Sequence, residues 1–175
     1  MAKFEDAIGI ILKHEGGFAD HPADPGGATN RGITFRLFKK YAVSLGLNPT
    51  LEDLKNLTEP QAKEIYFQEF WQRMRGSDFE SQQLANIAFD GFVNMGSRAL
   101  KLLQKEIGVK ADGMIGPISL SILNNSNETI VFEGFKDARI DFYKRLVVRK
   151  PPLEVFLNGW MNRINSFELD KDKLL

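Results

Sequence analysis

Residues 84–96 read Leu-Ala-Asn-Ile-Ala-Phe-Asp-Gly-Phe-Val-Asn-Met-Gly. Apolar side chains recur at every third or fourth position, which is the spacing of one face of a helix. The stretch ends at Gly96, a residue type that commonly follows the last turn of a helix. We therefore predict a central, largely buried helix from about Asp78 to Gly96. Its buried stripe consists of Leu84, Ile87, Ala88, Gly91, Phe92 and Met95.

The same helical spacing continues on both sides of this segment. The further predicted helices cover residues 4–14, 34–45, 58–74, 97–107, 117–123, 127–150 and 153–167. Thr34 and Asn127 are residue types that cap helix N-termini, and Thr58-Glu-Pro-Gln61 combines a capping box with proline in the first turn. No long segment alternates as a strand would. The sequence predicts an all-α fold with, at most, a very small hairpin in the loop over residues 18–32.

The composition excludes several classes of protein. The chain has 175 residues, 23 Lys and Arg, 23 Asp and Glu, and no cysteine, which rules out disulfides, zinc–thiolate sites and a thiol nucleophile. Zero net charge argues against a nucleic-acid partner. No run approaches the roughly 18 apolar residues of a membrane span, and the N-terminus lacks a secretory apolar stretch. We expect a soluble monomer, made in the cytoplasm without a signal peptide.

The loop after the first predicted helix contains the candidate catalytic residues. Residues 14–34 read His-Glu-Gly-Gly-Phe-Ala-Asp-His-Pro-Ala-Asp-Pro-Gly-Gly-Ala-Thr-Asn-Arg-Gly-Ile-Thr, with carboxylates at Glu15, Asp20 and Asp24. Hydrolysis of a glycosidic bond needs one protonated carboxyl group and one ionised carboxylate. Glu15 fits the acid because the C-terminal end of a helix disfavours negative charge and raises a carboxyl pKa. The glycines after it let a bulky substrate approach.

Each of these residues also has an ordinary structural interpretation. A glutamate before Gly-Gly is commonly a solvated surface residue, and Asp24 heads a turn sequence whose amides its side chain could bond. His14, Asp20, His21 and Asp24 lack a regular metal-ligand spacing, so a hydrated loop explains them better than a metal site. We predict no metal and no cofactor.

At this level of detail the sequence resembles a known family. Glu-Gly-Gly-aromatic at 15–18, followed by Asp-Pro-Gly-Gly-Ala-Thr-Asn-Arg-Gly-Ile-Thr at 24–34, is similar to the N-terminal signature of glycoside hydrolase family 108. These are peptidoglycan N-acetylmuramidases, found among phage-type endolysins and proteins once labelled secretion activators. Phe89–Gly96 resembles the family's central helix. Leu102-Leu-Gln104 with Asp112-Gly-Met-Ile-Gly-Pro117 resembles the predicted peptidoglycan-binding module that follows it.

The resemblance implies a lysozyme-like α fold that cleaves the β-1,4 bond between N-acetylmuramic acid and N-acetylglucosamine. It implies Glu15 as the general acid. Asp24, nine residues later, corresponds to the second carboxylate, with Asp20 as its rival. Thr29 would orient the attacking water, although it lies fourteen residues after Glu15, one fewer than in related lysozymes.

Two further residues are candidates for contacts with substrate. Trp71 either belongs to the core or stacks on sugar at the rim of the cleft. Asn94 is a polar residue on an otherwise apolar helix, where it either satisfies a structural hydrogen bond or contacts an acetamido group or water.

We expect a lysozyme-like catalytic lobe over residues 1–96 and a helical peptidoglycan-binding lobe over 97–175, packed into one body. The rival hypothesis is a non-catalytic wall-binding or structural component. The substrate lies in the periplasmic or extracellular cell wall, so a holin or another export partner is expected. Six basic residues within 136–150 form either a solvated helix face or a face for the anionic wall, whose binding would weaken with salt. They are Lys136, Arg139, Lys144, Arg145, Arg149 and Lys150.

Overall fold

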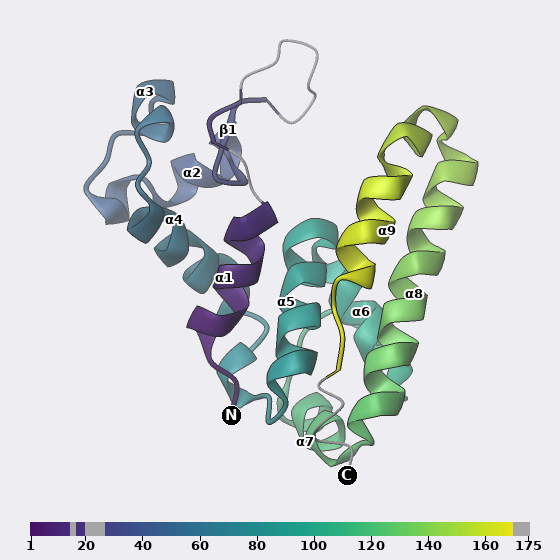
Figure 1. Ribbon diagram of the computed structural model, residues 1–175. Coiled ribbons are helices and arrows are strands. Elements are labelled where there is room, and N and C mark those ends of the chain that lie inside the picture. The colour runs from purple at the N-terminus through teal and green to yellow at the C-terminus, as the bar shows by residue number, and fades with distance from the viewer. Residues whose placement is uncertain (15–16, 20–26, 170–175) are drawn as a thin grey trace. The chain divides into compact units, whose positions relative to one another are not determined.

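The structure is a computed structural model, and it describes residues 1–14, 17–19 and 27–169. Helices dominate it (Figure 1), and the only sheet in these ranges is one hairpin of two short strands, β1 (Thr29–Asn30) and β2 (Ile33–Thr34). The all-α, lysozyme-like fold with a very small hairpin is thus confirmed. The helices are α1 Phe4–His14, α2 Phe35–Tyr41, α3 Leu51–Lys55, α4 Glu59–Tyr66, α5 Gln82–Met95, α6 Ser97–Glu106, α7 Pro117–Asn125, α8 Glu128–Arg149 and α9 Leu157–Asn165.

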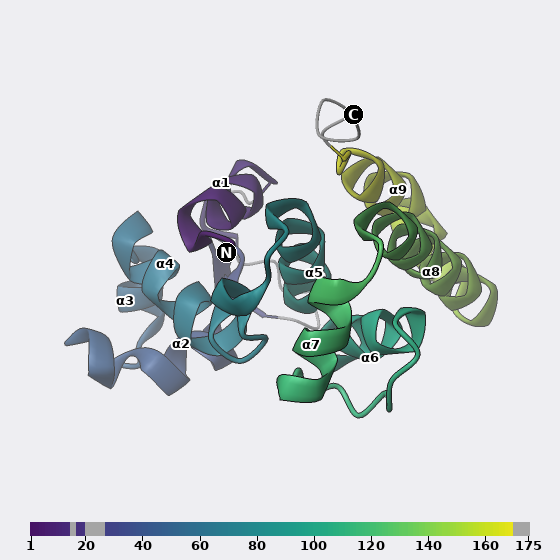
Figure 2. The ribbon, with the colours of Figure 1, turned by 90° about the horizontal axis from the view of Figure 1, so that it is seen from below.

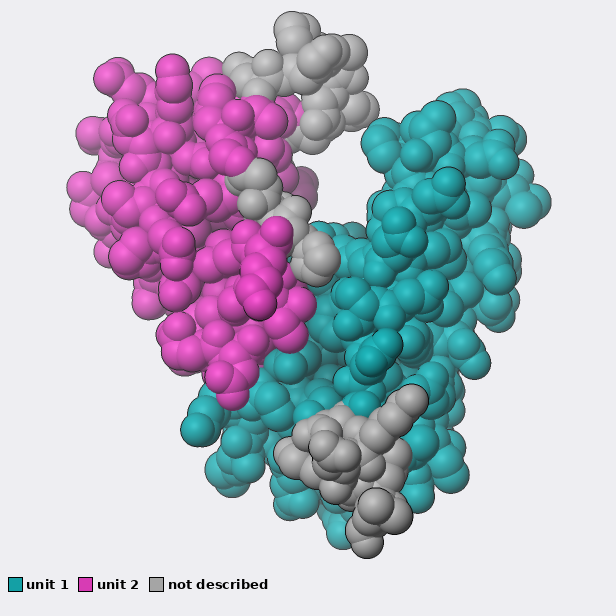
Figure 3. Space-filling model, in the orientation of Figure 1, with its two compact units in different colours: residues 1–3, 73–175 teal, residues 4–72 magenta. Residues whose placement is uncertain are grey.

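The chain forms two compact units, coloured separately in Figure 3. One consists of residues 4–72, and the other of residues 1–3 and 73–175. The division falls before α5, whereas the sequence analysis divided the chain after it. Tight packing explains the position of α5: a Cβ atom on Gly91 would lie 3.1 Å from Ala99 Cβ and 3.2 Å from Phe135 Cζ. Helices α5, α6 and α8 are therefore parts of one core.

In residues 4–72, local capping defines the helices as predicted. Thr34 caps α2 by accepting a hydrogen bond from the amide of Leu37 at 3.2 Å. The amide of Thr58 donates to Gln61 Oε1 at 3.0 Å in the capping box that begins α4. The predicted helix over 58–74 continues from α4 into a π-helical turn, Phe67–Trp71, in which the amide of Gln72 donates to Phe67 O at 2.9 Å.

In residues 73–175, α5 is buried almost all round, as its pattern predicts. Helices α8 and α9 lie side by side (Figures 1 and 2), and Asn127 caps α8 by accepting from the amide of Ile130 at 3.1 Å. The last helix was predicted over residues 153–167, but α9 begins only at Leu157. A 3-10 segment, Pro151–Phe156, precedes α9 and breaks the helical period, and Phe156 is 54% exposed.

Candidate active site

The hairpin β1–β2 lies in the loop that the sequence marks as catalytic. Its turn residues, Arg31 (φ 50) and Gly32 (φ 75), both have positive φ, as the two-residue turn favoured by hairpins requires. Thr29 pairs with Thr34 across the hairpin. Thr29 also exchanges two backbone hydrogen bonds of 2.8 Å with Ala19. The half-buried Thr29 is thus held beside a residue only four positions beyond Glu15.

Polar side chains fix this hairpin to the helices around it. Asn30, 5% exposed, donates from Nδ2 to the carbonyls of Leu54 and Lys55, both at 2.9 Å. These carbonyls belong to the last turn of α3, where the helix itself supplies no donors. The Tyr66 hydroxyl of α4 donates to Arg31 O at 3.0 Å, and Arg31 Nε donates to Leu57 O at 3.2 Å. The sequence does not indicate this anchoring role of Asn30, because asparagine is an ordinary residue of turns and its bonding partners lie 24 and 25 residues away.

The three candidate carboxylates, Glu15, Asp20 and Asp24, lie outside the described residues, as do His21 and the side chain of His14. Helix α1 is described to His14, so Glu15 is the next residue along the chain. These positions remain predictions from the sequence.

Trp71 belongs to the core. It is fully buried, and its ring lies 5.7 Å from that of Phe4. The π-helical turn adds one residue between Tyr66 and Trp71, which turns Trp71 inward and leaves Phe70 half-buried. A buried indole offers no face to a sugar, so the stacking interpretation of Trp71 is wrong for this conformation.

Asn94 is exposed on α5, in the unit formed by residues 1–3 and 73–175. Its Nδ2 donates to Asp90 O at 2.8 Å and to Asp90 Oδ1 at 3.3 Å. The structural hydrogen bond considered from the sequence is therefore present. The amide nitrogen of Asn94 is thus engaged by Asp90. Thr29 and Trp71 belong to the other unit.

Asp90 itself joins three helices through a buried ion-pair cluster. Its carboxylate, fully buried on α5, accepts from Arg139 Nη2 of α8 at 2.5 Å and from Arg163 Nε of α9 at 2.7 Å. Arg139, 1% exposed, also donates to the carbonyl of Ile87 at 3.1 Å. Burial of an ionised carboxylate is tolerated only with such partners.

The cluster corrects the expectation that six basic residues within 136–150 share one exposed helix face. The sequence does not predict the cluster itself. Arg139 is not part of a basic surface, and Lys136 donates to the carbonyl of Phe167 at 2.9 Å from a half-buried position. The exposed cations of α8 are therefore confined to its C-terminal part. The sequence does show a charged residue, Asp90, on the apolar face of a predicted helix. It does not indicate which residues pair with Asp90, because these partners lie 49 and 73 residues away.

The motif at 112–117 forms a loop held by one buried side chain. Gln104, 1% exposed, donates to Asp112 Oδ1 at 2.9 Å and to Met114 O at 3.0 Å, and its Oε1 accepts from the amide of Gly113 at 2.7 Å. The hydrogen bond from Gln104 and one from the amide of Met114 lower the pKa of Asp112 below its ordinary value. Gly113 has a φ of 85, a backbone conformation that residues with a side chain rarely adopt.

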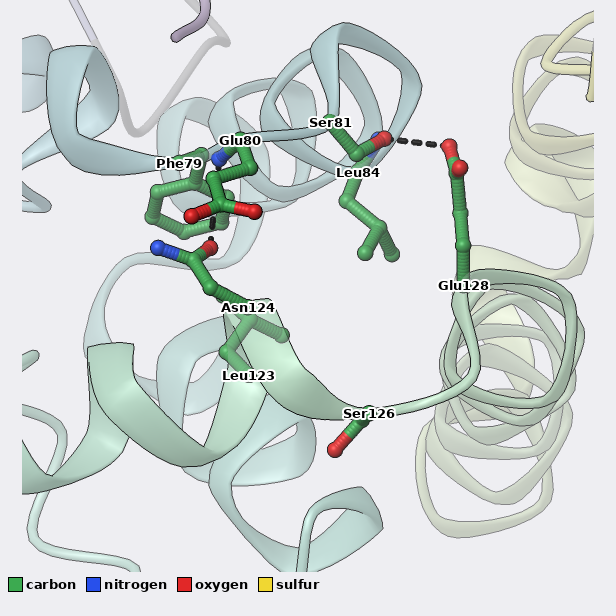
Figure 4. A pocket seen from close by; sticks show the side chains of 8 residues that line it. All are labelled: Phe79, Glu80, Ser81, Leu84, Leu123, Asn124, Ser126 and Glu128. Carbon is green, nitrogen blue, oxygen red and sulfur yellow. Dashed lines mark hydrogen bonds between the residues drawn. The ribbon is translucent and has the colours of Figure 1, made fainter.

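A cavity of about 270 Å³ lies between the start of α5 and the α7–α8 connection (Figure 4). Ser81 donates to Glu128 across it, and the amide of Glu80 donates to Asn124 Oδ1 at 3.1 Å. None of the residues that we predicted as catalytic or substrate-binding lines this cavity. Its polar groups cap helices and hold loops.

Comparison with known proteins identifies the class. The family model described as glycosyl hydrolase 108 matches residues 8–96, and the model described as a predicted peptidoglycan domain matches residues 98–165. The solved structure of Brucella abortus SagA is 30% identical, with a TM-score of 0.75, over 95% of this chain and 96% of that one. The chain belongs to the glycosyl hydrolase 108 family and is a glycoside hydrolase that acts on peptidoglycan. No curated protein matches it significantly.

Proposed function

We propose that this protein is an N-acetylmuramidase that cleaves the β-1,4 bond between N-acetylmuramic acid and N-acetylglucosamine. The observation that carries the proposal is Glu15-Gly16-Gly17, the acid and its two glycines, inside the region that matches the glycosyl hydrolase 108 family. The peptidoglycan domain that follows fits a substrate of wall glycan strands.

In this proposal Glu15 protonates the glycosidic oxygen as the bond to the leaving sugar breaks. It follows α1 directly, and the C-terminal end of a helix disfavours a carboxylate and favours its protonated form. A protonated carboxyl group at neutral pH is what a general acid requires.

Asp24 supplies the second carboxylate, with Asp20 as the alternative. The ionised group either activates water or stabilises the positive charge that develops on the sugar. Thr29 is the residue proposed to orient that water. Its main chain is tied to Ala19 and to Thr34, so its position is fixed by backbone hydrogen bonds.

Asn94 is the proposed contact for substrate. Since its Nδ2 is taken by Asp90, its side chain offers an acceptor, which suits the N–H of an acetamido group. We expect Asn94→Ala to raise KM about tenfold with little change in kcat, because it removes one hydrogen bond to bound substrate. Steady-state kinetics on solubilised glycan chains would measure this. A fall in kcat at unchanged KM would remove Asn94 from substrate binding.

The role of Glu15 is tested by Glu15→Gln, which keeps the size of the side chain and removes its acidic proton. We expect the rate at which new reducing ends appear to fall by about 10² to 10⁴. Glu5→Gln is the matched control, since Glu5 is an exposed carboxylate on α1, 3.5 Å from Lys63. Equal activity in the Glu15 variant and the wild type would exclude Glu15 as the acid. Wall binding without any reducing ends from the wild type would support the non-catalytic alternative.

Asp24→Asn and Asp20→Asn separate the two candidates for the second role. The variant with the larger loss of kcat identifies the carboxylate, and the anomer formed first, observed by NMR, distinguishes a base from a nucleophile. Equal, small losses in both would contradict the two-carboxylate mechanism.

We propose further that the enzyme acts as a monomer on the periplasmic or extracellular wall, with a holin or another export partner. The support is the location of the substrate. A cell that makes the protein without such a partner should remain intact, and adding a holin should cause lysis. Lysis without a holin would contradict this part of the proposal.

A further inference from the structure

Residues 148–156 comprise the last two residues of α8 and the connection to α9, at one end of the helix pair (Figure 1). We call this segment the hairpin tip. All of its residues except Leu153 are exposed. The exposed fraction is 81% for Val148, 78% for Val155 and 54% for Phe156. Neighbouring apolar side chains exposed to this degree commonly mark a surface that contacts another molecule.

The hairpin tip is held in shape by aromatic packing. Trp160 of α9 stacks on Tyr143 of α8, with ring centroids 4.5 Å apart and planes 24° apart. The ring of Phe156 lies 5.9 Å from that of Trp160. Pro151 and Pro152 restrict the backbone further. Phe156 is therefore presented to solvent by a fixed support.

Positive charge surrounds these apolar side chains. Lys144, Arg145, Arg149 and Lys150 are exposed, and Glu154 is the only acidic residue between positions 144 and 156. Within the part of the chain that the structure describes, none of the four cations forms an ion pair. Their charges are thus available to a partner.

We propose that the hairpin tip docks on an anionic phospholipid bilayer. Val148, Val155 and Phe156 would enter the boundary between headgroups and acyl chains, and the four cations would contact lipid phosphates. Basic residues beside exposed apolar ones are typical of proteins that lie on membrane surfaces. An anionic wall polymer would use the cations but has no apolar phase for Phe156. The exposed apolar residues therefore favour lipid over wall polymer.

The test uses the full chain and sedimentation with vesicles. We expect binding to vesicles that contain phosphatidylglycerol, weaker binding at high salt, and none to pure phosphatidylcholine. Arg149→Gln with Lys150→Gln should weaken binding about 30-fold, because each cation near an anionic surface contributes about fivefold. Val155→Ser with Phe156→Ser should weaken it about tenfold.

Matched controls lie elsewhere on the same unit. Ile130→Ser changes an apolar residue of α8 that is 66% exposed, and Lys101→Gln with Lys105→Gln removes two exposed cations of α6. Both should bind vesicles as the wild type does. Val148→Ser serves as a second apolar variant, since it leaves the Phe156–Trp160 contact intact. The apolar variants and the controls at Ile130, Lys101 and Lys105 should hydrolyse purified peptidoglycan at the wild-type rate, which separates membrane docking from catalysis.

Three results would overturn the proposal. The first is wild-type protein that does not bind phosphatidylglycerol vesicles at low salt. The second is unchanged vesicle binding by folded tip variants. The third is binding to soluble linear polyphosphate that matches vesicle binding and is unaffected by the apolar variants, since it would assign the tip to an anionic polymer.

Discussion

Each of the two compact units is stabilised internally by a different kind of polar contact. In residues 4–72, Asn30, Tyr66 and Arg31 bond main-chain carbonyls and so fix the shape of a hairpin. In residues 73–175, a buried carboxylate and two guanidinium groups join helices far apart in sequence. The first arrangement positions backbone beside the predicted catalytic loop. The second makes α5, the helix that carries Asn94, depend on α8 and α9.

Because of this difference, substitutions in the two units should have different structural consequences. Loss of a side chain that bonds carbonyls leaves a few polar groups unpaired and disturbs one loop. Loss of Asp90 leaves two cations, one of them fully buried, without their anion, which affects a whole core. The expected losses of stability therefore differ in size and in how much of the unit they affect.

The largest effect is expected for Asp90→Ala. Removing one partner of a buried ion pair lowers the free energy of unfolding by about 3–5 kcal/mol. Urea unfolding would measure it. Asp78→Ala is the matched control, because the Asp78–Arg75 pair is exposed and contributes less than about 1 kcal/mol. If both variants lose the same stability, the cluster does not organise this unit.

A smaller effect is expected for Asn30→Ala, which removes the side-chain donor to the Lys55 carbonyl and one of the donors to the Leu54 carbonyl. The Leu54 carbonyl keeps the hydrogen bond from the amide of Leu57 at 3.1 Å. The free energy of unfolding should fall by about 2 kcal/mol. Activity should fall further than stability explains, because Thr29 loses its support. Asn56→Ala, at an exposed position near the same helix end, should change neither. Loss of stability at unchanged activity per folded molecule would separate the hairpin from the active site.

The smallest effect concerns Asp112 and pH. Its pKa is lowered in the folded state, so its contribution to stability is present above the unfolded value of 3.8 and is lost as pH falls through the lower folded value. Asp112→Asn should therefore reduce stability slightly at pH 7, and the difference from wild type should shrink towards pH 2. Thermal unfolding at several pH values would measure it. A difference that grows on acidification would contradict the assigned hydrogen bonds.

Local features were predictable from the sequence, and long-range ones were not. Helix periodicity and the caps at Thr34, Thr58 and Asn127 act within a few residues, so their pattern is visible in the chain. The π-helical turn that buries Trp71 reflects tertiary packing. The partners of Asp90 were also not predictable, because they are arginines on two other helices and local sequence patterns carry no information about such distant contacts. The class of enzyme was also predictable, because the signature at residues 15–18 and 24–34 resembles that of the family whose model matches residues 8–96.

The central claim is the bond that the enzyme cleaves, and end-group analysis of its products tests that claim most directly. Purified peptidoglycan would be digested, the new reducing ends reduced with borohydride, and the sugar at those ends identified. We predict reduced N-acetylmuramic acid, absent from a digest with Glu15→Gln. Reduced N-acetylglucosamine as the sole new end, or no new end at all, would contradict the assignment.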